Sequence, residues 1–539
     1  MAKWWPIVER LLFFISYYLY FPSVNFVFWL YHSILTRKQC VYAPDSNSLL
    51  TVSATQASEM IRNRVIRCVD IIEAYIDRIE KVNEAINAVV VKNFEEARKQ
   101  ARQVDDYLDR LDKNSDEYKN LATTKPLLGV PFTLKDCIEV EGLVCTAGIS
   151  CRRDVVSEKD AEVVKRVKNS GAIVLAVTNV PEVCMWWESV NSVYGRSKNP
   201  YDTRRITGGS SGGEGALLAA AGSVIGIGSD IGGSIRMPAY FNGVFGLKPT
   251  PGVVPLEGHL PEAVGYRERM LRIGPMCRYA KDLQIMLKIF AGEEAENQLQ
   301  LSRPISVRNL RIFYMEGIHH FLTESLHEDC KWALKRAVQY FEKKYDLVAY
   351  RLDLPLAHNA NEYFVTSMDV DGAPSFAKHL ADLKGEVNCL AEIPKLVMGK
   401  SNHTLPALIL GVVDQQKPFS EKKAQILRNL RDRLQRQLME LLQDDGILLF
   451  PSFPTVAPFH HQPLLTPFNF SYTALWNTLA LPVVQCPMGL NDDGVPVGVQ
   501  AIGSPNADRL LISVANDLEE GFGGWKPLRN PHQTANHAH

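Results

Sequence analysis

The sequence lacks the features that mark several classes of protein. Lys and Arg number 59 against 60 Asp and Glu, so the net charge is −1 and no global field attracts a polyanion. We therefore expect no nucleic-acid partner. The chain has no internal repeat and no low-complexity tract, and 46% of its residues are hydrophobic, which excludes disordered and fibrous classes.

Paired cysteines and nucleotide-binding motifs are also missing. None of the ten cysteines forms the C-x-x-C spacing of zinc and dithiol sites, so we expect free, buried thiols and no metal. No lysine follows either glycine cluster at the P-loop position, and Gly226 and Gly228 lie inside a predicted strand, where a Rossmann fingerprint cannot lie. The sequence therefore predicts no bound nucleotide.

Charge is absent from one long segment. Residues 11–35 contain no Lys, Arg, Asp or Glu over 25 positions, more than the ~20 apolar residues that span a bilayer. Pro22 and Asn25 would kink this helix and bury an amide, so a spanning helix and an in-plane or re-entrant anchor both remain open. A cleavable signal peptide and a soluble core helix are disfavoured by the length of the segment. We expect residues 1–40 to form a hydrophobic membrane anchor.

The surroundings of this segment bear on localisation. We expect a membrane protein, single-pass or monotopic, on an endomembrane, and its orientation stays open. The flanking charges favour a cytosolic body; they are Lys3, Glu9, Arg10, Arg37 and Lys38. Sequons at Asn402 and Asn469 would matter only in a secretory lumen and do not decide the compartment.

The remaining chain is predicted to be an α/β domain over residues 53–530, after a linker at 41–52 and before a disordered polar tail at 531–539. Helical spacing predicts helices at 53–62, 68–79 and 422–442. Short β-branched runs bounded by Gly or Pro predict buried strands at 127–134, 172–177, 223–228, 310–314, 447–450 and 497–502. This alternation predicts a mixed, mostly parallel twisted sheet with helices on both faces.

Glycine is concentrated in residues 207–238, where two Gly-rich turns bracket one predicted helix and strand. Adjacent glycines allow close approach of the backbone, and such loops can bind an oxyanion through their amides. The letters Gly208-Gly209-Ser210-Ser211-Gly212 match a G-x-S-x-G elbow, but the polar residues before them are not the buried strand that an elbow follows. No histidine has the surroundings of a triad base, so another base is required.

The run GGSSGGEGALLAAAGSVIGIGSDIGGSIRMPA at 208–239 resembles the amidase signature family. The likeness extends over about residues 50–525 and includes Leu134-Lys135-Asp136. Together with the amino-terminal segment, the chain is similar to the membrane-associated fatty-acid amide hydrolases of that family rather than to its soluble amidases. The resemblance implies a single large amidase-signature domain with an N-terminal hydrophobic helix.

The resemblance also implies a Ser-Ser-Lys triad. Ser234 would be the nucleophile, Ser210 the proton-relaying bridge and Lys135 the base, and a cis peptide bond would lie at Gly209-Ser210. A lysine must be uncharged to accept a proton, so its burial belongs to the mechanism.

Further positions follow from the family pattern. The N–H groups of Ile231, Gly232, Gly233 and Ser234 would form an oxyanion hole. Cys184 and Met185 would line the substrate pocket, whereas Trp186 and Trp187 would mainly pack. Asp230 and Arg236 are expected to form a structural ion pair. No cofactor is implied.

The implied activity is hydrolysis of fatty-acid amides, both N-acylethanolamines and primary fatty amides, to fatty acid and amine through an acyl-enzyme. The partners would be a lipid amide and a membrane, and a homodimer stays open. Two alternatives remain: a non-catalytic lipid-binding or scaffold protein on this fold, and an amidotransferase subunit. Residues 290–440 contain no recognisable code for substrate selectivity.

Overall fold

The computed structural model describes residues 5–42, 48–305 and 307–528. The predicted tail at 531–539 and the middle of the predicted linker lie outside these ranges. The ten cysteines are all free, and eight of them are buried, as predicted.

An eleven-stranded sheet runs through the domain in the order β1-β3-β2-β6-β8-β7-β12-β13-β11-β9-β10. A separate two-stranded hairpin lies at β4 (Val190–Asn191) and β5 (Gly195–Arg196). The large sheet consists of β1 (Val89–Lys92), β2 (Pro131–Lys135), β3 (Ile173–Thr178), β6 (Ile225–Asp230), β7 (Phe245–Lys248), β8 (Arg272–Cys277), β9 (Arg311–Tyr314), β10 (Tyr350–Arg351), β11 (Gly446–Pro451), β12 (Val483–Leu490) and β13 (Pro496–Ile502).

The sheet is mixed, as expected, but the prediction that it is mostly parallel is wrong. Among the described strands, six of its pairings are antiparallel and four are parallel. The parallel pairs join β2 to β3 and β6, and β9 to β10 and β11. Between these two groups the strands pair antiparallel. A short turn joins β12 to β13, for example, and so brief a connection allows only antiparallel pairing.

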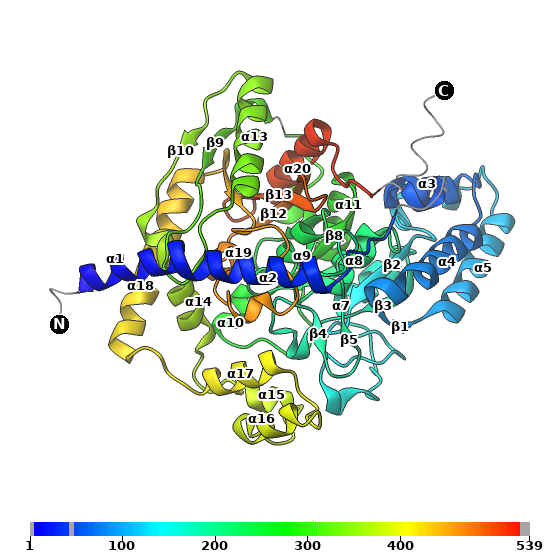
Figure 1. Cartoon of the computed structure of the whole chain (residues 1–539). Coiled ribbons are helices and arrows are strands. Elements are labelled where there is room, and N and C mark those ends of the chain that lie inside the picture. The colour runs from blue at the N-terminus through cyan, green and yellow to red at the C-terminus, as the bar shows by residue number, and fades with distance from the viewer. Residues whose placement is uncertain (1–4, 43–47, 306, 529–539) are drawn as a thin grey trace.

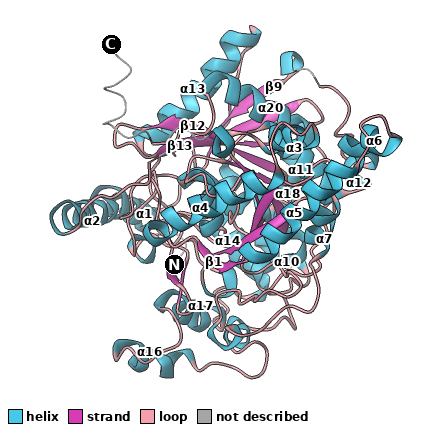
Figure 2. Cartoon of the chain, turned by 90° about the vertical axis from the view of Figure 1, so that its right-hand side faces the viewer, coloured by secondary structure: helices cyan, strands magenta, loops and turns pink. Residues whose placement is uncertain are grey.

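Helices surround this sheet (Figure 2). The three helices predicted from periodicity are present, and Ser53 and Gln56 form the predicted capping box of α3. The helices of the domain are α3 (Ala54–Arg62), α4 (Cys68–Ile86), α5 (Phe94–Arg110), α6 (Asp116–Thr124), α7 (Glu162–Asn169), α8 (Gly212–Ala219), α9 (Arg236–Phe241), α10 (Tyr266–Met270), α11 (Lys281–Ala291), α12 (Glu294–Asn297), α13 (Glu328–Tyr345), α14 (Ala360–Met368), α15 (Phe376–Leu380), α16 (Cys389–Val397), α17 (Leu405–Asp414), α18 (Glu421–Leu442), α19 (Ser471–Thr478) and α20 (Asp508–Phe522).

The six predicted strands are all present, with shifted ends. The largest shift is at the predicted strand 127–134, which begins only at Pro131 because residues 126–129 form a turn. Gly129 adopts a φ of 74° there, a conformation that favours glycine. The strand nevertheless ends at Lys135, next to the residues of the site.

The amino-terminal segment is one long helix that lies across the body of the protein (Figure 1). It consists of α1 (Trp5–Ile15), a π-helical turn (Ser16–Tyr20) and α2 (Phe21–Leu35). The π turn comes directly before Pro22, whose ring would clash with a carbonyl in the preceding turn of an α-helix. The irregularity expected at this proline therefore takes the form of a widened turn. Within this helix, the stretch Ile7–Leu35 is apolar and long enough to span a membrane.

Candidate active site

Three elements of the sheet region bring the predicted site residues together. Lys135 is the last residue of β2, Ser234 follows the end of β6, and Ser210 lies in the loop before α8. Strands β2 and β6 are adjacent and parallel, so their carboxyl ends meet at the same edge of the sheet. The helix α8 packs on both strands and places its preceding loop at that edge.

The amine of Lys135 is enclosed by hydroxyl groups. Its Nζ atom lies 2.7 Å from Oγ of Ser210 and 2.9 Å from Oγ of Ser229. Lys135 has no exposed surface and Ser210 has 1%. No carboxylate of the described residues forms an ion pair with this amine. The amine is therefore buried among neutral hydroxyl groups, within hydrogen-bond distance of Ser210.

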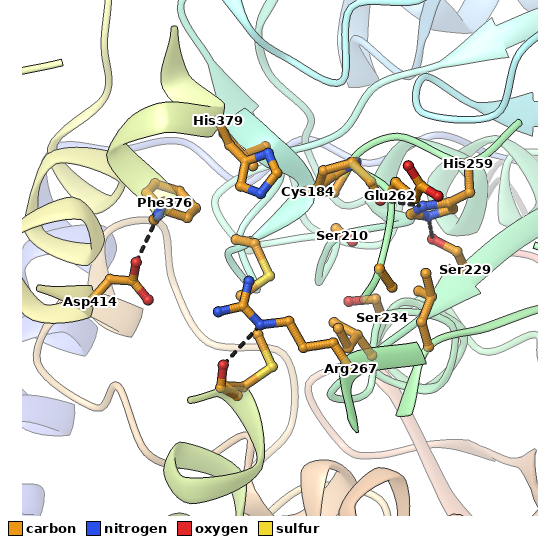
Figure 3. A pocket seen from close by; sticks show the side chains of 17 residues that line it. Cys184, Ser210, Ser229, Ser234, His259, Glu262, Arg267, Phe376, His379 and Asp414 are labelled. Atoms are coloured by element: carbon orange, nitrogen blue, oxygen red, sulfur yellow. Dashed lines mark hydrogen bonds between the residues drawn. The ribbon is translucent and has the colours of Figure 1, made fainter. Parts of the chain in front are cut away.

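Ser234 faces the same cavity as Ser210 (Figure 3). The Ser234 side chain is 7% exposed, and its backbone carbonyl accepts a hydrogen bond from the N–H of Ser211 at 3.1 Å. The peptide bond between Gly209 and Ser210 is cis, as the resemblance implies.

The expected oxyanion hole is smaller than the four amides of the family pattern. The N–H of Gly233 donates to Oδ1 of Asp230 at 2.7 Å, so it points away from the cavity. Within the described ranges, the amides of Ile231, Gly232 and Ser234 donate no hydrogen bond. These three remain as donors for a substrate oxyanion, and all three residues border cavity space.

Asp230 and Arg236 brace the loop that carries Ser234. Two parallel hydrogen bonds of 3.0 Å join them, and both side chains are fully buried. Asp230 also accepts from the amide of Asn477 at 2.9 Å. Burial would raise the pKa of Asp230, but the Arg236 guanidinium holds it well below its usual range. The pair is structural, as expected.

Two cavities share Ser234 in their linings. The first, which we call the polar chamber, has about 70 Å³ and is bordered by His259, Glu262, Arg267, His379 and Asp414 as well as by Ser210. The second, which we call the apolar chamber, has about 100 Å³, and it is lined by Trp186, Trp187, Met237, Phe364, Leu410 and Phe470.

Cys184 and Met185 border both chambers, as the resemblance implies. Val183 and Cys184 both have positive φ, 58° and 56°. Their turn is held from outside by Glu182, whose carboxylate accepts hydrogen bonds from the backbone N–H and hydroxyl of Thr404 at 2.9 and 3.0 Å. Trp186 and Trp187, expected mainly to pack, line the apolar chamber as well.

Two buried acids, Glu214 and Asp136, lie near the edge of the sheet where β2 ends. Burial raises the pKa of Glu214 to about 7, although Thr133 and Thr178 donate hydrogen bonds to it. Burial likewise raises the pKa of Asp136, the residue after Lys135, to about 7. Both acids are therefore much easier to keep neutral than ordinary carboxyl groups.

Sequence reasoning missed Ser229 and His259. Oγ of Ser229 lies 2.8 Å from Nε2 of His259, and both residues border the polar chamber. Ser229 belongs to the Gly-rich run, so its place near the site could have been inferred. His259 comes from a loop far along the chain, and its sequence surroundings contain no signal.

Comparisons with known proteins agree with this geometry. The Amidase family model matches residues 70–512. Fatty-acid amide hydrolase 2 of Homo sapiens is 43% identical over 488 residues, which cover 89% of this chain and 91% of that protein. A glutamyl-tRNA(Gln) amidotransferase subunit of Oleidesulfovibrio alaskensis is 28% identical, covering 87% of this chain and 97% of that protein. A solved structure of fatty acid amide hydrolase superposes with a TM-score of 0.72 at 23% identity, covering 93% of this chain and 89% of that one.

Proposed function

Since the chain belongs to the Amidase family, we propose that it is a membrane-associated serine hydrolase that cleaves fatty-acid amides to a fatty acid and an amine. N-acylethanolamines and primary fatty amides are the proposed substrates. The observation that carries the proposal is the buried amine of Lys135, 2.7 Å from Ser210, beside a cavity that Ser234 shares. The relatives named fatty-acid amide hydrolase 2 support the choice of substrate.

Acylation starts with proton movement away from the nucleophile. Lys135 takes the proton of Ser210, and Ser210 takes that of Ser234, whose oxygen attacks the amide carbonyl. The negative charge that develops on the carbonyl oxygen is stabilised by the free amides of Ile231, Gly232 and Ser234. One such donor contributes ~10²–10³ in rate.

Collapse of the tetrahedral intermediate requires a proton on the leaving nitrogen, because an amine anion is a very poor leaving group. Ser210 supplies this proton and regains one from Lys135. Water then attacks the acyl-enzyme on Ser234, by the same proton path, and releases the fatty acid.

The two chambers give the substrate a direction. The apolar chamber, with its aromatic rings, suits the acyl chain, and the polar chamber suits the leaving amine. An aminoacylated RNA would need a basic surface, which the net charge of −1 does not supply. The amidotransferase alternative is also the less similar comparison, at 28% against 43% identity.

Covalent labelling tests this proposal. A fluorophosphonate reacts with an activated serine, so we expect wild-type protein to be labelled and Ser234→Ala to be unlabelled and inactive on oleamide. Ser211→Ala is the matched control, because this buried serine, next to Ser210 in the chain, donates its hydroxyl hydrogen to the carbonyl of Ser229 and does not line the cavity. An unlabelled wild-type protein would favour the non-catalytic lipid-binding alternative.

The contacts of the amino-terminal helix with the rest of the protein support an anchor that lies in the plane of the membrane surface. The whole helix would then stay on the side of the membrane that carries the body. The amide of Asn25 donates to Glu324 at 2.9 Å and accepts from Gln462 at 2.6 Å. Further along the helix, His32 stacks on Phe459 with ring centroids 4.4 Å apart. A helix that crossed a bilayer would have to break these contacts with the body.

Many other side chains of the same helix are apolar and accessible. The most exposed are Tyr18, Ile34 and Leu35, at 70%, 69% and 68%. Such an apolar surface suits the boundary between headgroups and acyl chains. An enzyme held there could take its lipid substrate directly from the bilayer.

Membrane topology can be measured with an impermeant maleimide on sealed vesicles. Glu9→Cys and Arg37→Cys place one thiol at each end of the helix, in a Cys40→Ser, Cys151→Ser background that removes the two least buried native thiols. An in-plane anchor exposes both thiols on the same side of the membrane. Labelling from opposite sides would show a spanning helix and overturn this topology.

A further inference from the structure

The hydroxyl of Ser229 connects Lys135 to a histidine that the triad does not use. Oγ of Ser229 lies 2.9 Å from Nζ of Lys135. The same oxygen lies 2.8 Å from Nε2 of His259 (Figure 3). Nδ1 of His259 lies 3.1 Å from the carbonyl oxygen of Pro261. We propose that His259 is a positioning residue that acts through Ser229 to keep the lone pair of Lys135 turned toward Ser210. The proposal rests on the hydrolase function proposed above.

The carbonyl of Pro261, at one end of this series of contacts, determines the direction of each hydrogen bond in it. A carbonyl oxygen only accepts, so Nδ1 of His259 carries a proton. In the neutral ring Nε2 is then an acceptor, and it takes the hydrogen of the Ser229 hydroxyl. A hydroxyl has a single hydrogen, so Ser229 can only accept from Lys135.

This arrangement of donors and acceptors fixes the orientation of the Lys135 amine. A neutral lysine has two hydrogens and one lone pair, and one hydrogen is directed to Ser229. The lone pair is left for the other close hydroxyl, that of Ser210 at 2.7 Å. Without an acceptor at position 259, the Ser229 hydroxyl would be free to donate to the amine and compete with Ser210 for the lone pair. His259 thus prevents the Ser229 hydroxyl from competing with Ser210 for the lone pair of Lys135.

His259 lies in an enclosed place. Only 7% of its surface is exposed, and its Nε2 also lies 3.5 Å from Sγ of Cys137. Glu262 borders the same polar chamber. The outer depression that His259 borders also contains Glu139, Lys159, Glu257 and Glu268.

The kcat and KM for oleamide test the role. In His259→Gln the amide oxygen can accept the hydrogen of Ser229 as the ring nitrogen does, so this variant should keep kcat within about threefold of wild type. His259→Phe supplies no acceptor and should lose about tenfold in kcat at every pH, with KM within twofold of wild type.

Two controls separate the histidine from its surroundings. Cys137→Ala should keep the kcat of wild type, which assigns the effect to the histidine and not to the thiol 3.5 Å from its Nε2. In a Ser229→Ala background, the Gln and Phe variants should become equal in kcat, because the effect passes through that hydroxyl. Equal kcat of the two variants in the Ser229 protein would overturn the proposal. A wild-type protein without labelling or turnover would instead contradict the hydrolase function.

Discussion

The amine of Lys135 and the hydroxyl of Ser210 are 2.7 Å apart in a space with almost no solvent access. The amine has the hydroxyl of Ser229, at 2.9 Å, as a second close partner. The contact between Lys135 and Ser210 joins the end of β2 to the loop before α8, so it depends on the packing of the sheet and helix and not on either segment alone.

Loss of the lysine should affect amides more than esters. In Lys135→Ala, oleamide hydrolysis should fall by ~10²–10⁴, because protonation of the leaving nitrogen fails, and the matching ester should lose clearly less. The rates are compared across a pH series. Lys248→Ala is the control, since this other buried lysine donates to the carbonyl of Leu481 and lies outside both chambers. Equal losses on amide and ester would contradict the assignment of Lys135 as base.

A side chain at Gly233 should damage the turn before the nucleophile. Gly233 has a φ of 124°, and an added Cβ would overlap the Thr473 hydroxyl. We expect Gly233→Ala to reduce kcat on oleamide by ~10² or more, as the neighbouring amides lose their alignment. Gly494→Ala is matched, with a φ of 74° but open space around the new Cβ. It should lose stability slightly and keep its kcat, and a comparable loss of kcat there would refute the explanation.

A charged side chain in the apolar chamber should slow the hydrolysis of long-chain amides more than that of short-chain amides. Leu410 of α17 borders this chamber, so Leu410→Glu should lower kcat/KM for oleamide at least about tenfold, because a carboxylate beside the chain must be desolvated. Butyramide, which is too short to reach it, should be hydrolysed nearly as before. Ile409→Glu, on the exposed side of the same helix, serves as control. Parallel losses for both substrates would mean that the acyl chain lies elsewhere.

The buried acid Glu214 should make stability depend on pH. Its pKa of about 7 exceeds the ordinary 4.5, so between these values the folded state keeps a proton that the unfolded chain has lost. Its contribution to the free energy of unfolding therefore falls as pH rises from about 4.5 to 7, and is constant above. Glu214→Gln should flatten this part of the profile, measured by denaturant unfolding at pH 5 and pH 8. A variant with the wild-type slope would assign the dependence to other groups.

Local patterns predicted much of the fold because the forces that create them are local. The capping box at Ser53 and Gln56 and the spacing of Lys422–Leu442 identified helices whose ends the structure places within a residue or two. The sense of strand pairing was harder. Much of the antiparallel centre of the sheet pairs segments that are distant in the chain, such as β7 with β12 and β6 with β8, and periodicity within one strand does not reveal its partner's direction.

The candidate site also contains features that the sequence predicts and features that it does not. The glycine-rich run and Lys135 could be recognised from their neighbours in the chain. The diversion of the Gly233 amide to Asp230 could not, because it depends on how the backbone turns after β6. The apolar chamber also required side chains from α14 and α17, in the region where the sequence contains no recognisable code, and from the loop before α19.

The order of residues alone determined which groups are available: two serines among glycines, one lysine at the end of a buried strand, and an amino-terminal segment with 25 uncharged positions. Only the tertiary structure decided what surrounds them. It closed the lysine off from water, set His259 behind it through Ser229, and laid the amino-terminal helix along the body by way of Asn25. Burial and hydrogen-bond direction arise from atoms brought together across hundreds of residues, and no short stretch of chain specifies them.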